Sequence, residues 1–244
     1  MQFNKKGNNP VLAIGFLFKG VKLLTRPELR KFIIIPILIN VVLYSAALTL
    51  GYFYISDLIA QFIPGWLHWL SWFLWPLFFI SFFIAGFFTF TVLANILAAP
   101  FYGQLSAKTL AIVSDEIQEQ AEQPLAKVLI AELRRVGYLS SRALPLLILS
   151  VIPGVNILAP FLWALFGAWG IALEYLAYPL ENQGVLFSEQ KDLVNSVRLG
   201  ALSFGGLTVL GLTVPVLNII VAPAAVIGAT LYVHEIEQQS ITPP

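Results

Sequence analysis

The sequence NILAAP at residues 95–100 returns as NILAP at 156–160 and as NIIVAP at 218–223, each time inside an otherwise apolar stretch. The last two copies carry a proline shortly before the asparagine, Pro153 and Pro215. Proline breaks a helix because its ring fixes φ and because it has no N–H to donate. In lipid, such a break is tolerated only where protein or a wet cavity surrounds the freed polar groups. The repeat therefore predicts a membrane-embedded unit whose breaks mark either a transport pathway or the plain turns of two hairpins.

The composition of the chain points to a membrane. Hydrophobic residues make up 58% and charged residues 11% of the 244 residues, whereas a soluble domain has about 25% charged residues. The formal net charge of +1 indicates no basic face for a nucleic acid, so no such partner is expected. The absence of cysteine excludes disulfides and thiol chemistry.

Segment lengths predict an all-α integral membrane protein with a single membrane domain, residues 1–244. The uncharged segment 32–55 is long enough to cross a hydrocarbon core of about 30 Å, and the tryptophans that follow are spaced like an aromatic belt at a membrane surface. The later apolar segments are short or borderline, which predicts two re-entrant (hemi-penetrating) helical hairpins. The expected elements are an interfacial amphipathic helix at 10–24, spanning helices at 27–55 and 66–99, a cytoplasmic polar helix pair at 104–142, and membrane hairpins at 143–178 and 199–233.

The placement of charge predicts which parts of the chain face the cytoplasm. Seven of the fourteen basic residues precede the first spanning segment, and five lie in the central polar stretch. The positive-inside rule then puts the N-terminus, the polar stretch and the 181–198 loop on the cytoplasmic side. The second polar helix has a basic face with Lys127, Arg134 and Arg142. This face would pair with the acidic first helix, meet lipid phosphates, or line a cytoplasmic anion vestibule.

The segment TRPELRK at residues 25–31 is the clearest candidate for a binding site in the chain. Its threonine and proline predict a helix N-terminus, where free N–H groups and the helix dipole favour the binding of an anion. Arginine can grip a tetrahedral oxyanion with two parallel N–H bonds. The alternative is a capping box in which Thr25 and Glu28 satisfy the same N–H groups. The cationic donors of the segment are Arg26, Arg30 and Lys31.

No pattern in the sequence indicates an enzyme. His68 and His234 are the only histidines and form no H-E-x-x-H metal site, and no G-x-S-x-G nucleophile elbow occurs. No nucleotide-binding G-x-x-x-x-G-K-[ST] loop is present. We therefore expect no cofactor or metal, and any transport would be channel-like, gradient-driven or proton-coupled. The alternative function is a membrane assembly or structural protein without transport activity.

Four short motifs occur in an informative order: LWPL at 74–77, AAPF at 98–101, IPG at 152–154 and YPLEN at 178–182. With the tryptophan-rich hairpin, they make nearly the whole chain resemble the CysZ family of bacterial sulfate permeases. The resemblance implies a multi-pass protein of the bacterial inner membrane that supplies sulfate for cysteine biosynthesis. It also implies two spanning helices, hemi-penetrating helix pairs, and assembly in the lipid bilayer as a homo-oligomer, either a dimer or larger.

The resemblance further implies sulfate binding near a Pro-Gly-Leu/Ile-Arg motif, which matches Pro27, Leu29 and Arg30. Glu28 stands where glycine is usual in the family. Its carboxylate would repel a dianion unless it folds back into the cap and leaves the N–H groups of Leu29 and Arg30 available. The expected substrate-binding residues are therefore Arg26, Glu28, Leu29, Arg30 and Lys31.

From that site, sulfate is expected to pass along polar breaks in the apolar helices. Buried amides can donate to an anion, although they also commonly hydrogen-bond across helices or cap turns. An ionisable residue in an apolar segment is a candidate proton or gating site, or it simply reaches the membrane interface. The pathway candidates are Asn40, Asn95, Asn156, Asn218, Glu174 and Arg134.

Overall fold

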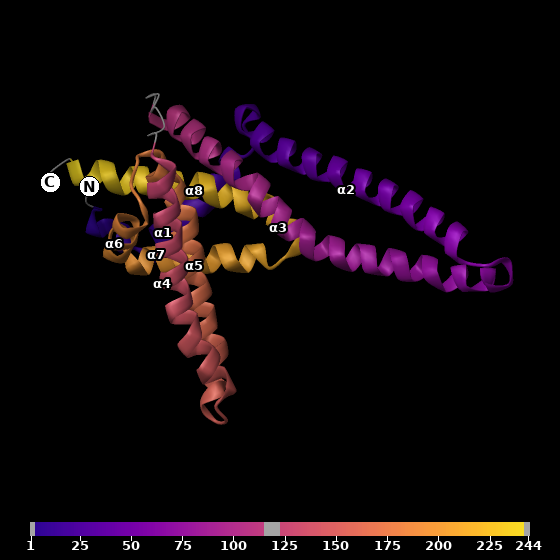
Figure 1. Ribbon diagram of the computed structural model, residues 1–244. Coiled ribbons are helices and arrows are strands. Elements are labelled where there is room, and N and C mark those ends of the chain that lie inside the picture. Colours follow the sequence, from indigo (N-terminus) through magenta and orange to yellow (C-terminus); the bar gives the residue numbers. More distant parts are fainter. Residues whose placement is uncertain (1–2, 115–122, 242–244) are drawn as a thin grey trace. The chain divides into compact units, whose positions relative to one another are not determined.

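The computed structural model describes residues 3–114 and 123–241, and all regular elements in these ranges are helices (Figure 1). Within these ranges, four segments are long and apolar enough to cross a membrane: Pro27–Gln61, Gly65–Gly86, Val155–Asn182 and Leu217–Gln238. The pair Phe187–Ser196 and Arg198–Leu212, bent by 103°, would supply a fifth. The chain is thus an all-helical, multi-pass membrane protein.

The chain divides into two compact units: Lys31–Phe101, and Met1–Arg30 together with Tyr102–Pro244. Two long helices, α2 (Pro27–Phe62) and α3 (Ser71–Ser114), continue from one unit into the other. The remaining elements are η1 (Lys5–Asn8), α1 (Pro10–Leu23), η2 (Gly65–Leu70), α4 (Leu125–Val151), η3 (Val155–Leu158), α5 (Ala159–Asn182), α6 (Phe187–Ser196), α7 (Arg198–Leu212) and α8 (Pro215–Ile241).

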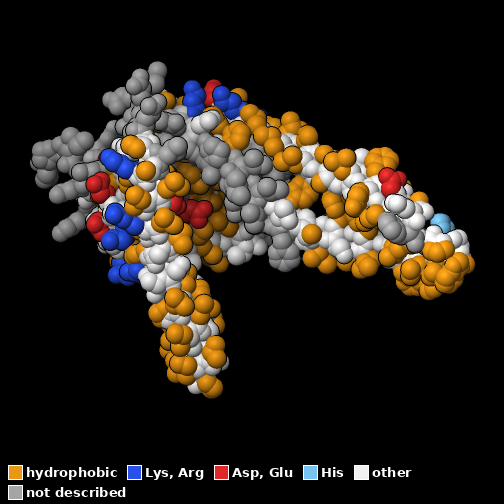
Figure 2. Space-filling view, in the orientation of Figure 1, with side chains coloured by type: hydrophobic (Ala, Val, Ile, Leu, Met, Phe, Trp, Pro, Cys, Tyr) orange, Lys and Arg blue, Asp and Glu red, His pale blue; other side chains and the backbone are white. Residues whose placement is uncertain are grey.

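The unit Lys31–Phe101 is a pair of long helices joined by η2. The Tyr44 hydroxyl of α2 donates to the Gly86 carbonyl of α3 at 2.9 Å, and the Tyr52 ring stacks on Trp75 with centroids 4.8 Å apart. The most apolar 18-residue window of each candidate span here contains no buried residue, and hydrophobic side chains cover much of the described surface of these helices (Figure 2). Such a surface is stable in lipid and would be costly in water.

The larger unit is built around α8, which is buried without interruption from Ala222 to Val233. The Tyr232 ring lies against Phe16 of α1 and Phe204 of α7, with centroid distances of 5.8 and 6.3 Å. The Tyr232 hydroxyl donates to the Gly7 carbonyl. A single aromatic side chain therefore ties together α1, α7, α8 and the N-terminal segment.

Small residues bring the helices of this unit almost into backbone contact. A Cβ on Gly20 of α1 would overlap the carbonyl oxygen of Ala224 on α8, and one on Gly205 of α7 would overlap that of Ala168 on α5. Small residues at helix crossings are typical of membrane proteins, where close van der Waals packing drives helix association.

Helix boundaries differ from the expected ones in the polar stretch. Helix α3 runs through Pro100 to Ser114, and α4 combines the expected second polar helix with the first arm of the 143–178 hairpin. Residues 138–144 contain neither glycine nor proline to end a helix, and Pro145 is carried inside α4. The acidic residues expected to face the basic helix fall at 115–122, outside the described residues.

Candidate functional site

The predicted anion site lies where α1 ends and α2 begins. The N–H of Arg26 donates to the Leu23 carbonyl at 3.0 Å, which forms the turn between the helices. The Leu29 side chain is fully buried and anchors the first turn of α2. Basic and acidic side chains gather on the surface at this point (Figure 2). The exposed charged side chains are Arg26, Glu28, Arg30 and Lys31.

The side chains at this helix start do not form the capping box. The Thr25 hydroxyl donates backwards to the Lys22 carbonyl at 2.8 Å, and Glu28 makes no side-chain hydrogen bond within the described residues. The Leu29 N–H donates to the Arg26 carbonyl at 3.1 Å, so Leu29 contributes packing in this conformation. One Arg30 guanidinium nitrogen donates to the Thr25 carbonyl at 2.8 Å, which holds the side chain over the turn. Three cations and one carboxylate give the cluster a local charge of +2, complementary to a dianion.

The repeated asparagines lie at different kinds of position. Asn156 is in η3 between α4 and α5, and Asn218 is in the first turn of α8, at the ends of two different helix pairs (Figure 1). Both side chains are exposed. The side chains of Asn40 and Asn95 lie outside the described residues, although the NILAAP copy itself is inside uninterrupted α3. The two copies with a second proline thus coincide with helix breaks, and the copy without one does not.

Glu174 and Arg134, the other two pathway candidates, are both exposed. Glu174 is on α5 near a group of tyrosines: the rings of Tyr102 and Tyr178 are 5.6 Å apart between centroids. Burial, and secondarily the charge of Glu174, raises the pKa of Tyr102 to about 12, so its phenol stays protonated at neutral pH. Arg134 donates to the Ser188 hydroxyl of α6 at a long 3.4 Å.

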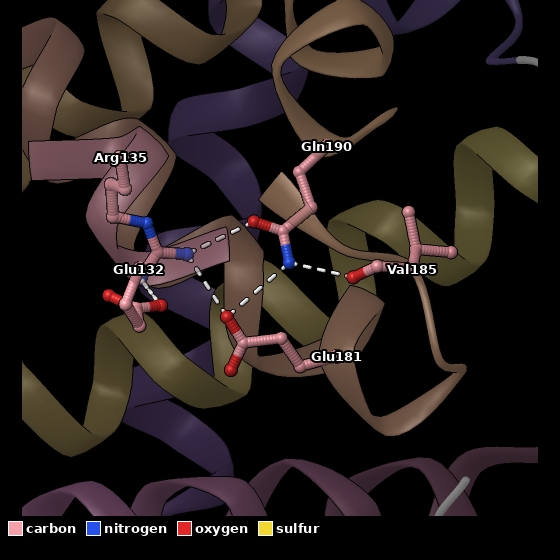
Figure 3. A network of polar contacts seen from close by, with 5 residues as sticks. All are labelled: Glu132, Arg135, Glu181, Val185 and Gln190. Atoms are coloured by element: carbon pink, nitrogen blue, oxygen red, sulfur yellow. Dashed lines mark hydrogen bonds and ion pairs between the residues drawn. The ribbon is translucent and has the colours of Figure 1, made fainter. Parts of the chain in front are cut away.

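A polar network centred on Arg135 was not predicted from the sequence (Figure 3). Its guanidinium contacts Glu132 Oε1 at 2.9 Å, and both Glu181 Oε1 and Gln190 Oε1 at 3.0 Å. The Gln190 amide, only 1% exposed, donates to Glu181 at 3.3 Å and to the Val185 carbonyl at 2.8 Å. The network joins α4, α5 and α6. The Glu132–Arg135 spacing and the YPLEN motif were available signals, but nothing in the sequence marked Gln190.

The helices and candidate spans define a multi-pass helical membrane protein, and a cluster of exposed charged residues lies at the start of α2. A family model described as sulfate transporter CysZ/etoposide-induced protein 2.4 matches residues 16–223. The chain belongs to this family.

Curated relatives match over most of their length and most of this chain. "Sulfate transporter CysZ" of Pseudomonas paraeruginosa is 38% identical over 226 residues, 89% of this chain and 92% of the relative. The protein of the same name from Pseudomonas syringae pv. tomato is 41% identical over 226 residues, 89% of each chain. That from Pectobacterium atrosepticum is 36% identical over 242 residues, 95% of this chain and 88% of the relative.

Proposed function

We propose that this protein is a sulfate permease that admits sulfate across the bacterial inner membrane for cysteine biosynthesis. The observation that carries the proposal is the similarity to sulfate transporters, 36–41% identity over 89% or more of the chain. The candidate membrane spans supply the required setting. Movement of sulfate is passive and channel-like or is coupled to protons.

The proposed sulfate site is the start of α2. Arg26, Arg30 and Lys31 supply charge and donors, while the buried Leu29 fixes the helix start beneath them. The Glu28 carboxylate does not cap the helix, and it lowers the affinity for sulfate by like-charge repulsion. A lower affinity suits a site that must also release its anion. We place the route beyond this site along the pathway candidates named above, with Asn156 and Asn218 at the helix breaks.

The proposed membrane arrangement has α2 and α3 crossing the bilayer, while the α4–α5 and α7–α8 pairs enter and return. Apolar exposed surface on these helices faces lipid or a second protomer, which supports a homo-oligomer, a dimer or larger. The basic residues of the N-terminus and of α4 face the cytoplasm under the positive-inside rule.

Uptake of radiolabelled sulfate into proteoliposomes tests the function. Wild-type protein is expected to admit sulfate. Arg30→Ala should reduce uptake at low sulfate by about tenfold, because it removes charge-assisted hydrogen bonds. Lys22→Ala, which removes a nearby exposed cation outside the proposed site, should leave uptake unchanged.

Uptake with and without an imposed pH gradient separates the passive route from the proton-coupled one. Absence of sulfate flux through the correctly inserted wild-type protein would overturn the permease proposal and favour an assembly role without transport. Equal uptake by Arg30→Ala and wild type would remove the proposed site but leave the permease.

A further inference from the structure

A second cationic site lies in a pocket of about 490 Å³ between α4, α5, α6 and α7. None of its lining residues belongs to the charged cluster at the start of α2. Apolar side chains form one part of the lining, and charged or polar ones form the other. The polar part includes Tyr138, Arg142, Trp169, Lys191, Asn195 and Arg198.

The charges in this pocket are unbalanced. Lys191 pairs with Asp192 at 3.3 Å, and Asp192 is the only carboxylate in the pocket lining. Arg142 and Arg198 have no carboxylate partner among the residues that the structure describes. Three cations and one carboxylate leave a local charge of +2. Within residues 3–114 and 123–241, these two guanidinium groups have no counter-charge, which favours binding of an anion from solution.

The two guanidinium groups rest on a shared aromatic platform. Arg142 lies over the Tyr138 ring at 3.6 Å from its centroid and donates to the Tyr138 carbonyl at 3.3 Å. Arg198 lies over the Trp169 ring at 5.8 Å. The Trp169 indole N–H donates to the Tyr138 hydroxyl at 3.0 Å, which fixes the two rings to each other. Stacked arginines keep their N–H groups directed outward and lose less freedom when they bind an oxyanion.

We propose that this pocket is a second oxyanion site that binds a free tetrahedral dianion. The anion is sulfate, an identity that rests on the function proposed above. Arg142 and Arg198 bind it by charge-assisted hydrogen bonds, and Asn195 offers an amide donor. The volume admits a hydrated ion, so binding is weak and reversible, as a collecting site requires. A lipid phosphate headgroup shares this chemistry, and the experiment must separate the two sources.

The lack of cysteine in the chain makes a local test practical. Leu165 lines the pocket and is exposed, so Leu165→Cys places one thiol beside the proposed anion without removing a donor. The measurement is the rate of labelling by the neutral reagent N-ethylmaleimide in detergent. Sulfate is added at constant ionic strength, with chloride as the replacement ion.

Sulfate is expected to slow labelling severalfold, and chloride is not. Arg142→Gln/Arg198→Gln should raise the sulfate concentration for half-maximal protection by about tenfold or more, since it removes two charge-assisted donors. The matched control is Lys108→Gln/Lys127→Gln, which removes the same charge from exposed positions outside the pocket and should keep full protection. Arg198→Lys, which keeps the charge but loses the planar fork, gives a second and milder test with intermediate protection.

Three results would overturn the proposal. In the first, sulfate leaves the labelling rate of Leu165→Cys unchanged. In the second, protection by sulfate survives in Arg142→Gln/Arg198→Gln. In the third, nanodiscs with phosphatidylglycerol would slow labelling through Arg142 and Arg198 relative to phosphatidylcholine nanodiscs, while sulfate had no effect. That result would identify a lipid headgroup as the occupant.

Protection should persist in Leu165→Cys/Arg30→Ala, because Arg30 does not line the pocket. Loss of protection in this variant is a fourth result that would overturn the proposal, since the pocket would then not be an independent site. Sulfate uptake by wild type is read separately, so a failed pocket and a failed permease give different results.

Discussion

Gly205 of α7 has no space for a side chain, because a Cβ there would overlap the Ala168 carbonyl oxygen on α5. Its neighbour Gly206 would place a Cβ 3.6 Å from the Ala168 Cβ, an ordinary contact. Gly205→Ala should therefore force α5 and α7 apart and cost about 1–3 kcal/mol. Gly206→Ala should be neutral or stabilise by up to about 1 kcal/mol through helix propensity. Thermal unfolding of the two variants in the same detergent checks this prediction, and equal melting temperatures would contradict it.

Arg134 and Arg135, two neighbours on α4, should also differ in how much the same substitution destabilises the protein. Arg135 is 16% exposed and contacts three side chains from α4, α5 and α6, whereas Arg134 is exposed and makes one 3.4 Å contact. We expect Arg135→Gln to lower the free energy of unfolding by about 1–3 kcal/mol, because it leaves polar partners unsatisfied. Arg134→Gln should cost about 0–1 kcal/mol. Chemical or thermal unfolding distinguishes them, and an Arg134→Gln variant as unstable as Arg135→Gln would refute the structural role of the network.

At the scale of elements, the sequence could predict those features that depend on local chemistry. Pro153 and Gly154 mark the break after α4, where Gly154 takes a φ of +83° that only glycine adopts easily. The Arg135 network was beyond such reasoning, since Glu181 and Gln190 are 46 and 55 residues away along the chain. At Thr25 two local arrangements compete, a forward cap and a bond back to the Lys22 carbonyl three residues earlier, and the structure contains the second. Thr25 and Pro27 predicted the start of α2, and the family resemblance implied sulfate binding near it, but the resemblance gave no signal for the pocket between α4, α5, α6 and α7.

The proposed re-entrant pairs make a prediction about the breaks between their helices. Asn156 and Asn218 are exposed in the protein, so under this arrangement only lipid shields them from the outer solution. Asn156→Cys and Asn218→Cys should resist a membrane-impermeant maleimide added outside intact cells and react once detergent removes the bilayer. His68→Cys, in the η2 turn between the two spanning helices, should react from outside and is the control. Rapid external labelling at Asn156→Cys would show that α5 crosses the membrane completely.

For the whole molecule, the decisive question is on which side of the membrane α6 lies. By length and composition, Val155–Asn182 and Leu217–Gln238 are both able to span. The Trp163 indole of α5 donates to the Ser150 hydroxyl of α4 at 3.0 Å, so these two helices enter the membrane as a pair. Whether the pair crosses completely or enters and returns, α6 comes back to the side where α4 begins. Both arrangements keep Lys191 and Arg198 inside with the other basic residues, as the positive-inside rule favours.

The side of α6 also decides which solution the second cationic pocket samples, because Lys191 and Arg198 line it. We expect Glu189→Cys, an exposed α6 position outside the pocket, to react with an impermeant maleimide in inverted vesicles and not in intact cells. Labelling only from outside would reverse the prediction and make the pocket an entry site for incoming sulfate. Equal labelling from both sides would mean that protomers insert in opposite orientations, so that one pocket faces each solution. If α6 lies in the cytoplasm, the pocket accepts sulfate that has already crossed the membrane. The local charge of +2 in the pocket then retains the dianion near the exit.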